Sequence, residues 1–250
     1  MFLLGLILLL NTHFSFALEC LTNCTVGPFS FSQPFYIPYG QCLQRVSKNY
    51  CSISLKFNYK EQTYVAHFET YPITNDFIYV TSGPYLSYTI DYTCSNDASC
   101  AASYAEDLYD EMVSRNYDAE RIYGQIALYI ENSAREQPLR CYDLNNEIVT
   151  CLPDEMCSLE YNQNNNRIQS RGCVMSDVAR IAFYDSGTFA YFDVHCEKDL
   201  CNDMLTFSQI QTIFTNNDLT DSNGRKRSNS AFRQQITFSF SFLIFLINYI

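Results

Sequence analysis

The chain has 250 residues, 12 of them cysteine, and its formal net charge is −11 at pH 7. This length suits one large domain or two small ones. The acidic charge argues against nucleic acid and anionic membrane surfaces as partners, and a solvated extracellular surface is its simplest interpretation.

The N-terminal segment, residues 1–17, has the features of a signal peptide. Met1–Leu10 is almost wholly apolar, and Ser15-Phe16-Ala17 places small residues at positions −3 and −1 of a cleavage site. Polar residues follow Leu10, so the apolar run is too short to span a membrane. We therefore expect the mature protein to begin at Leu18.

All twelve cysteines follow that cleavage site, and twelve is an even number. In a secreted chain this pattern predicts a disulfide framework. Zinc binding is the alternative, but it requires Cys-x-x-Cys pairs or histidines at ligand spacing, and the mature chain has only His67 and His195. We therefore expect disulfides, with neither a metal site nor a cofactor.

Residues 18–100 are predicted to form a disulfide-bonded β domain. Ile53–Lys60 alternates apolar with polar residues, which is typical of a half-buried strand. Residues 63–71, 77–81 and 85–93 are rich in Tyr, Thr, Phe and Val and predict three more strands, separated by turn residues.

Residues 101–138 are predicted to be a helical connector and linker. Ala101–Arg115 has the apolar periodicity of a helix. Asp118 is a suitable N-cap for a second helix that reaches Ile130, although residues 126–130 also fit a strand. We place a domain boundary near Pro138.

Residues 139–205 form the second predicted β unit. Segments 158–161 and 167–173 flank an Asn-rich tip, and segments 178–184 and 189–194 flank Asp185-Ser186-Gly187, so two hairpins are expected. Residues 206–222 are predicted to be a polar tail.

The cysteines of this unit carry a family resemblance. The motifs are Leu139-Arg140-Cys141-Tyr142, then Cys151 and Cys157, then Arg171-Gly172-Cys173, and finally Cys196-Glu197-Lys198-Asp199-Leu200-Cys201-Asn202. Over residues 139–202 the chain resembles the three-finger family of the urokinase receptor, protectin and the snake neurotoxins. The resemblance implies bridges Cys141–Cys157, Cys151–Cys173 and Cys196–Cys201, and a structural role for Asn202.

The N-terminal half contains motifs that resemble these less closely. Leu18-Glu19-Cys20 resembles the family's opening, and Cys94 to Cys100 resembles its closing loop, but with five residues inside the loop and Ala101 in place of the asparagine. This half is therefore either a diverged three-finger module or an unrelated β domain. The sequence leaves the pairing of its six cysteines open: Cys20, Cys24, Cys42, Cys51, Cys94 and Cys100. The fold class that we expect is mainly β, with disulfide-rich three-finger-type modules and a helical connecting segment.

The C-terminal end predicts attachment to a glycosylphosphatidylinositol (GPI) anchor. Residues 236–250 are mostly apolar, are short for a membrane span, and follow the nearby basic residues. Small residues, a polar spacer and an apolar tail fit an anchor signal, with Ser222 as the expected site, Asn229 as the alternative and residues 223–250 as the removed propeptide. The other interpretations are an ordinary C-terminal strand and cleavage at Arg225-Lys226-Arg227.

The sequence gives little support to catalysis. His67 lies in a predicted strand and His195 adjoins Cys196, and neither has a nucleophile signature nearby, so structural roles are expected. The acidic residues of the first helix fit a solvated surface. Asn23-Cys24-Thr25 is a glycosylation acceptor at Asn23.

These observations predict a GPI-anchored cell-surface protein with a non-enzymatic role in protein recognition. The partner would be an extracellular or membrane protein, and the link to the membrane would be the lipid anchor. The hairpin tip offers Tyr161, Asn164 and Arg167 as possible binding residues. The alternatives are a secreted toxin-like or signalling effector and an extracellular hydrolase.

Overall fold

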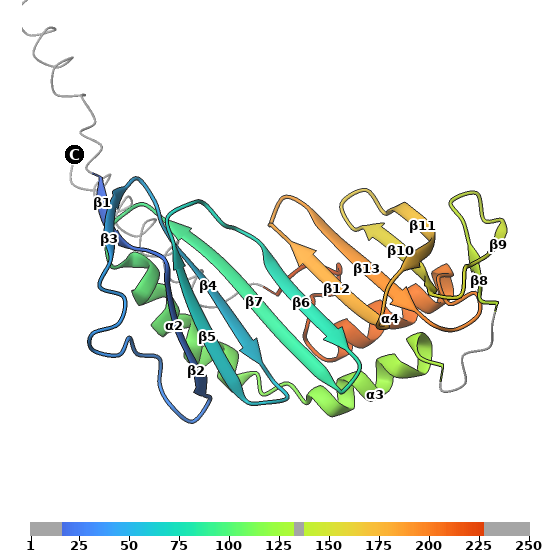
Figure 1. Ribbon diagram of the computed structural model, residues 1–250, viewed down its shortest axis with the longest axis horizontal. Helices are drawn as coiled ribbons and strands as arrows, with labels where there is room; N and C mark the ends of the chain where they lie inside the picture. Colours follow the sequence, from blue (N-terminus) through green and yellow to red (C-terminus); the bar gives the residue numbers. More distant parts are fainter. Residues whose placement is uncertain (1–16, 133–137, 228–250) are drawn as a thin grey trace, which may run out of the picture.

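One nine-stranded antiparallel sheet runs through the molecule in a computed structural model that describes residues 17–132 and 138–227 (Figure 1). Its strand order is β11-β10-β13-β12-β6-β7-β4-β5-β2. The strands are β2 (Cys24–Ser30), β4 (Cys51–Asn58), β5 (Thr63–Glu69), β6 (Asp76–Thr81), β7 (Tyr85–Cys94), β10 (Glu155–Asn162), β11 (Arg167–Met175), β12 (Arg180–Asp185) and β13 (Ala190–Cys196). Two small ribbons accompany the sheet, one of β1 (Leu18–Leu21) with β3 (Arg45–Lys48) and one of β8 (Arg140–Tyr142) with β9 (Ile148–Thr150).

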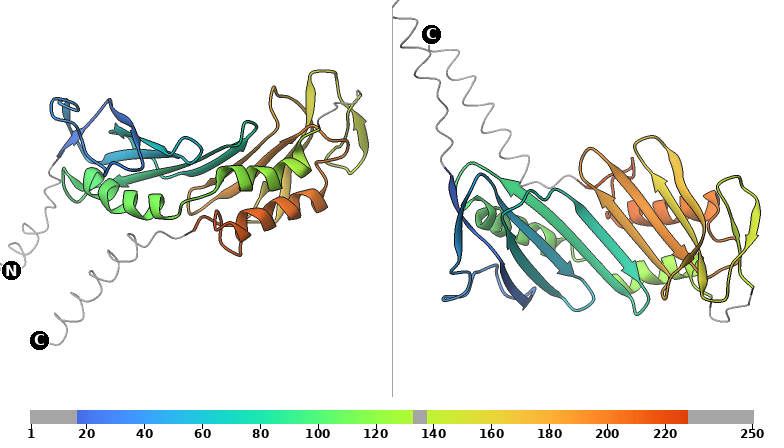
Figure 2. Two further views of the ribbon diagram at one scale, coloured as in Figure 1. Left: turned by 90° about the horizontal axis from the view of Figure 1, so that it is seen from below. Right: turned by 45° about the horizontal axis from the view of Figure 1, so that its top comes forward.

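The helices cover only one face of this sheet. Figure 2 shows α2 (Cys100–Ser114), α3 (Ala119–Ile130) and α4 (Met204–Asn216) on the same side. Along β6 the side chains that face the helices, such as Ile78 and Val80, are fully buried, while the alternate residues remain half-exposed. The core therefore lies between the sheet and the helices, and the opposite face carries no helix of the described residues. None of these helices is long and apolar enough to cross a membrane.

The two halves of the chain repeat one arrangement. Four strands (β4 to β7) precede α2, four strands (β10 to β13) precede α4, and each set has the same order in the sheet. A disulfide closes each junction between strand and helix, Cys94–Cys100 in one half and Cys196–Cys201 in the other. The halves meet where β6 pairs with β12. We call this strand pair the seam; because of it, the two predicted β units share a single sheet.

All twelve cysteines are bridged. The second half contains the three bridges that the resemblance implied, Cys141–Cys157, Cys151–Cys173 and Cys196–Cys201. In the first half the pairs that the sequence left open are Cys20–Cys51, Cys24–Cys42 and Cys94–Cys100. A bridged sulfur is no longer a thiolate, the form that binds metal, and six bridges fit an oxidising, extracellular environment.

The helices predicted in the middle of the chain are confirmed, but they do more than connect the two halves. Asp118 caps α3 by accepting a hydrogen bond from the Arg121 backbone nitrogen at 2.9 Å, so residues 126–130 are helix and not strand. Leu108 and Ile126 are fully buried against the sheet. The segment predicted as a connector thus supplies a large part of the core.

The prediction of a polar tail at residues 206–222 is wrong. These residues include most of α4, which buries Phe207, Ile210 and Phe214. The three apolar side chains recur at intervals of three and four residues and therefore occupy one face of the helix. The Thr, Ser, Gln and Asn residues between them face outward and gave the segment its polar composition.

Candidate functional site

The three residues proposed for the hairpin tip have different surroundings. The Tyr161 ring packs on Phe207 of α4, with centroids 4.5 Å apart. Asn164 fastens the two hairpins together, because its amide donates to the Thr188 carbonyl at 2.6 Å and its oxygen accepts from the Ala190 nitrogen at 2.8 Å. Arg167 is an exposed residue at the start of β11. Tyr161 and Asn164 therefore have structural contacts that compete with ligand binding.

Asn202 makes the backbone contacts of a structural residue. Its side-chain oxygen accepts from the Tyr142 nitrogen, and its amide donates to the carbonyls of Tyr142 and Ser158, all at 2.9 Å. The residue is 1% exposed. It thereby joins the β8–β9 ribbon to β10.

Two buried carboxylates face each other at the seam. Asp76 at the start of β6 pairs in register with Asp185 at the end of β12, and both are 1% exposed. Like charges opposite each other on neighbouring strands are destabilising, so this arrangement requires counter-ions.

The counter-ions come from the C-terminal end of the described chain. The Arg225 guanidinium forms two hydrogen bonds with Asp185, at 2.8 and 2.9 Å, and the Lys226 ammonium lies 3.3 Å from the Asp76 Oδ1 atom. The Lys226 backbone nitrogen also donates to Asp185 at 2.7 Å. We call residues 225–226 the clasp. Both residues are part of the folded structure, although they lie within residues 223–250, the propeptide that attachment at Ser222 would remove.

The two carboxyl groups have different proton affinities. Burial raises the pKa of Asp76 to about 6, although Lys226 opposes this shift. Burial acts on Asp185 in the same direction, but the hydrogen bonds from Arg225 and the Lys226 backbone outweigh it and hold the pKa of Asp185 below its usual range. Both carboxyl groups are therefore ionised at neutral pH.

A row of six aromatic side chains crosses the helix-free face at the seam. Successive ring centroids lie 6.1, 5.9, 4.4, 4.5 and 5.4 Å apart. The aromatic row consists, in spatial order, of Tyr85, Tyr79, Phe77, Tyr184, Tyr191 and Phe189. Phe189 is 42% exposed and the other five are half-buried. The row includes residues of β7, β6, β12 and β13 and of the turn before β13, and thus of both halves of the chain.

Two phenols of the aromatic row, those of Tyr184 and Tyr191, are held in the protonated form. Burial, with a contribution from Tyr184, raises the pKa of Tyr191 to about 12, and burial also raises the pKa of Tyr184. The phenols therefore remain hydrogen-bond donors. Rings with an apolar body and a polar tip are enriched in protein interfaces.

A polar cluster on the same face adjoins the row. Asp193 lies 3.1 Å from the His195 Nε2 atom and 3.4 Å from an Arg180 guanidinium nitrogen. His195 is only 6% exposed. This packing explains why a histidine stands next to Cys196 and gives it the structural contacts that were expected.

His67 has neighbours that the sequence did not reveal. Its Nδ1 atom lies 2.7 Å from the Thr25 hydroxyl on the facing strand, and its Nε2 atom lies 2.5 Å from Glu69. The imidazole is 42% exposed. The hydroxyl, imidazole and carboxylate stand in line at the β2 edge of the sheet.

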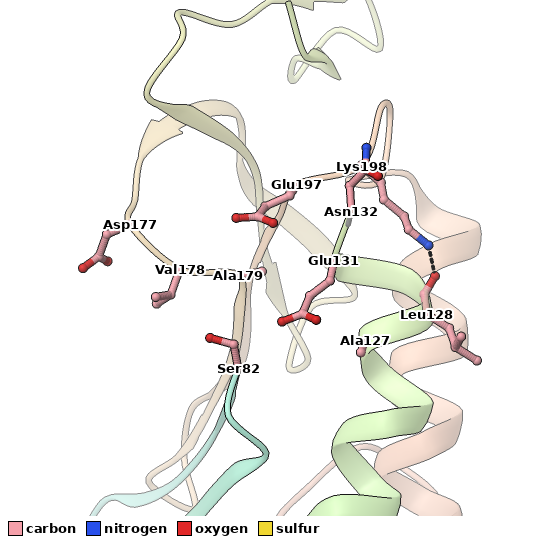
Figure 3. Close-up of a pocket in the computed structure, with 10 residues that line it drawn as sticks. All are labelled: Ser82, Ala127, Leu128, Glu131, Asn132, Asp177, Val178, Ala179, Glu197 and Lys198. Atoms are coloured by element: carbon pink, nitrogen blue, oxygen red, sulfur yellow. Dashed lines mark hydrogen bonds between the residues drawn. The ribbon is translucent and has the colours of Figure 1, made fainter. Parts of the chain in front are cut away.

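An acidic cleft lies at the opposite end of the seam from the clasp (Figure 3). Its volume is about 520 Å³, and Ser82, in the β6–β7 turn, and Val178, in the β11–β12 loop, face the end of α3 across it. Burial, followed by the charge of Glu197, raises the pKa of Glu131, whose carboxylate accepts a hydrogen bond from the Tyr123 hydroxyl. The Lys198 ammonium is bound to the Leu128 carbonyl. Glu131 and Glu197 can attract a cation to the cleft, but they do not provide a complete set of metal ligands.

The processing sites fall in different surroundings. Asn23 is exposed, and the next residue, Cys24, is bridged to Cys42. Ser222 is exposed in a turn in which the Asp221 carboxylate accepts hydrogen bonds from the nitrogens of Asn223 and Arg225, both at 2.8 Å. The signal peptide up to Phe16, Asn229 and the apolar C-terminal segment lie outside the described residues.

Comparison with known proteins adds no family. No family model matches the chain, and no curated protein matches it.

Proposed function

We propose that the protein is a GPI-anchored cell-surface protein that recognises an extracellular or membrane protein through the aromatic row. The observation that carries the proposal is the position of that row: half-exposed tyrosines and phenylalanines lie together on the one face of the central strands that no described helix covers. Aromatic anchors of this kind supply much of the energy of protein interfaces. The six disulfides fit the extracellular location.

The clasp favours Asn229 over Ser222 as the anchor site. Attachment at Ser222 would remove Arg225 and Lys226 and leave Asp185 and Asp76 buried without counter-ions. Breaking a buried ion pair in this way costs about 3–5 kcal/mol. Attachment at Asn229 keeps the clasp and leaves only two residues between Arg227 and the anchor.

The same contacts argue against a secreted effector made by cleavage at Arg225-Lys226-Arg227. A protease must bind its substrate as an extended segment, and the first two of these side chains are held in ion pairs with buried aspartates. Cleavage would require local opening of the C-terminal segment.

Two experiments test the proposal. Phosphatidylinositol-specific phospholipase C should release most of the protein from intact cells; if the protein stays with the cells, the proposal of a GPI anchor is wrong.

Separately, a fluorescent ectodomain ending at Asn229 should bind to cells that display the partner, and trypsin treatment of those cells should abolish the binding.

The aromatic row is tested in the same binding assay. The double variant Tyr79→Ala/Tyr184→Ala should weaken binding by roughly 10- to 100-fold, because two interface anchors are lost. The matched control is Tyr39→Ala/Tyr71→Ala, which removes two tyrosines that are 107% and 56% exposed outside the row. Equal binding by the two double variants would contradict a role for the row.

A second candidate function, hydrolysis, is favoured by one arrangement only, the line of Thr25, His67 and Glu69. A hydroxyl beside an imidazole that is itself held by a carboxylate is the pattern of an activated nucleophile. If this is correct, the purified protein should hydrolyse p-nitrophenyl acetate, and His67→Gln should abolish the reaction. A rate equal to that of buffer removes the candidate.

A further inference from the structure

A second cavity lies beside the clasp, and it contains an unsatisfied buried acceptor. The volume of the cavity is about 410 Å³, which is within the range of small-ligand sites. Asp76 lines it, and although this residue is 1% exposed, its Oδ2 atom has no hydrogen-bond partner. Such an atom normally has a partner, because an unpaired buried acceptor costs free energy.

The charged side chains that line the cavity indicate what type of hydrogen-bond donor would bind the Asp76 Oδ2 atom. Two carboxylates, Asp76 and Asp91, line it together with the Lys226 ammonium. Arg227 also contributes to the lining, but its guanidinium lies 3.2 Å from Asp218. Lys226 binds only the Oδ1 atom of Asp76 and leaves Oδ2 for another donor. The balance is negative, so a cationic donor is favoured over a neutral or anionic one.

The aromatic side chains that line the cavity indicate which kind of uncharged group the ligand would carry. Tyr92 of β7 and Tyr104 of α2 line it as a stacked pair, with ring centroids 3.6 Å apart and planes 11° apart. Such a wall favours a flat or apolar group. Thr74 is an exposed residue of the lining and therefore stands at the mouth.

We propose that this cavity binds a small primary amine, with its ammonium group on the Asp76 Oδ2 atom and an aromatic or apolar body against Tyr92 and Tyr104. The site is distinct from the aromatic row, which lies on the other face of the sheet, and it requires only that the mature chain retain Lys226 and Arg227. The simplest competing occupant of the Oδ2 position is water.

Binding should depend on pH, because the ammonium requires an ionised Asp76. The pKa of Asp76 is about 6, so the carboxylate is mainly ionised at pH 8 and mainly protonated at pH 5. The charged and titratable groups around it are Lys226 from the C-terminal segment, Asp185 from β12, and Asp91 and Tyr88 from β7. Burial raises the pKa of Tyr88 and that of Asp91, and the hydrogen bonds of Arg225 lower that of Asp185. Because Asp76 would contact the ammonium directly, its ionisation is expected to give the largest change in affinity.

The test is a titration of the mature protein, expressed from the full chain in a secretory host, followed by NMR chemical shifts. The probes are 2-phenylethylamine, 2-phenylethanol and phenylacetate, which share one aromatic body and differ in charge. At pH 8 the amine should bind at least tenfold more tightly than the other two, and its affinity should fall by at least fivefold at pH 5.

Two variants locate the site. Asp76→Asn should reduce the affinity for the amine at least tenfold. Thr74→Trp should block the mouth without removing a buried charge, which keeps the test decisive if Asp76→Asn does not fold. Asp199→Asn, in an exposed ion pair on the far side of the second half, is the control and should bind normally. Equal affinity for amine and alcohol, no binding of the amine, or full affinity in Thr74→Trp would each overturn the proposal and leave water as the occupant.

Discussion

Arg225 and Asp185 form an ion pair in which the carboxylate is buried. The guanidinium is held by two hydrogen bonds to a carboxylate that is 1% exposed. Arg225→Ala would leave that carboxylate buried and unpaired. We expect it to lower the free energy of unfolding by about 3–5 kcal/mol, measured by urea denaturation at pH 7.4.

Arg140→Ala is the matched control for this prediction. It removes a similar pair with Asp199, but both side chains are about half exposed. Solvent screens such a pair, so the midpoint of urea unfolding should hardly move. Equal midpoints for Arg225→Ala and Arg140→Ala would show that the clasp does not stabilise the fold.

Asp76 predicts how stability depends on pH. Its pKa is about 6 in the folded protein and 3.8 in the reference state, so between pH 4 and 6 the folded state holds a proton that the unfolded state has released. The free energy of unfolding attributable to Asp76 therefore falls as pH rises through this window, by about 3 kcal/mol in total. Above pH 6 no further loss is expected from this group.

Urea unfolding of wild type and Asp76→Asn at pH 4.5 and 7.5 measures this effect. Asparagine does not titrate, so the stability of the wild type relative to the variant should decrease between the two pH values. Parallel pH profiles for the two proteins would be inconsistent with a raised pKa at Asp76.

At the scale of elements, α4 carries the clearest prediction. Phe207 is 1% exposed and packs on Tyr161 and Phe192. Phe207→Ala should therefore cost about 3–5 kcal/mol in the free energy of unfolding. Leu205→Ala in the same helix is the control, because Leu205 is 71% exposed and its removal should change stability by less than about 0.5 kcal/mol. Similar losses for both variants would contradict the packing of α4.

The elements themselves were largely predictable, and the reason is the strength of their local patterns. Ile53–Lys60 alternates so regularly that β4 was placed within two residues of its observed ends. Asp118 marked the start of α3 because an aspartate satisfies the free nitrogens there. Helix α4 was missed because polar residues outnumber its three buried ones, so composition concealed the periodicity.

The candidate sites were not predictable, because they depend on the pairing of β6 with β12. These strands are separated by about a hundred residues, and no local pattern links Asp76 to Asp185 or Phe77 to Tyr184. Residues 77–81 were expected to form a strand, but nothing in the sequence shows that one face of this strand lacks a helix. The basic residues at 225 and 226 suggested only processing.

At the scale of the whole molecule, the two halves are joined by one sheet and by one C-terminal segment. The seam brings two aspartates together, and the clasp, which ends three residues before Asn229, neutralises them. A mature chain that ended before Arg225 would lose both counter-ions. If Asn229 is the anchor site, as we propose, the choice of that site also preserves the stability of the fold.

Mass spectrometry of the C-terminal peptide of the mature cell-surface protein tests this account most directly. Protein released by phosphatidylinositol-specific phospholipase C would be digested with an endoprotease that cleaves before aspartate, so that the peptide beginning at Asp221 is recovered intact. The account predicts a peptide that contains Arg225-Lys226-Arg227 and ends at Asn229 with the anchor glycan. A mature chain that ends at Ser222, or at Arg227 with no glycan, would contradict it.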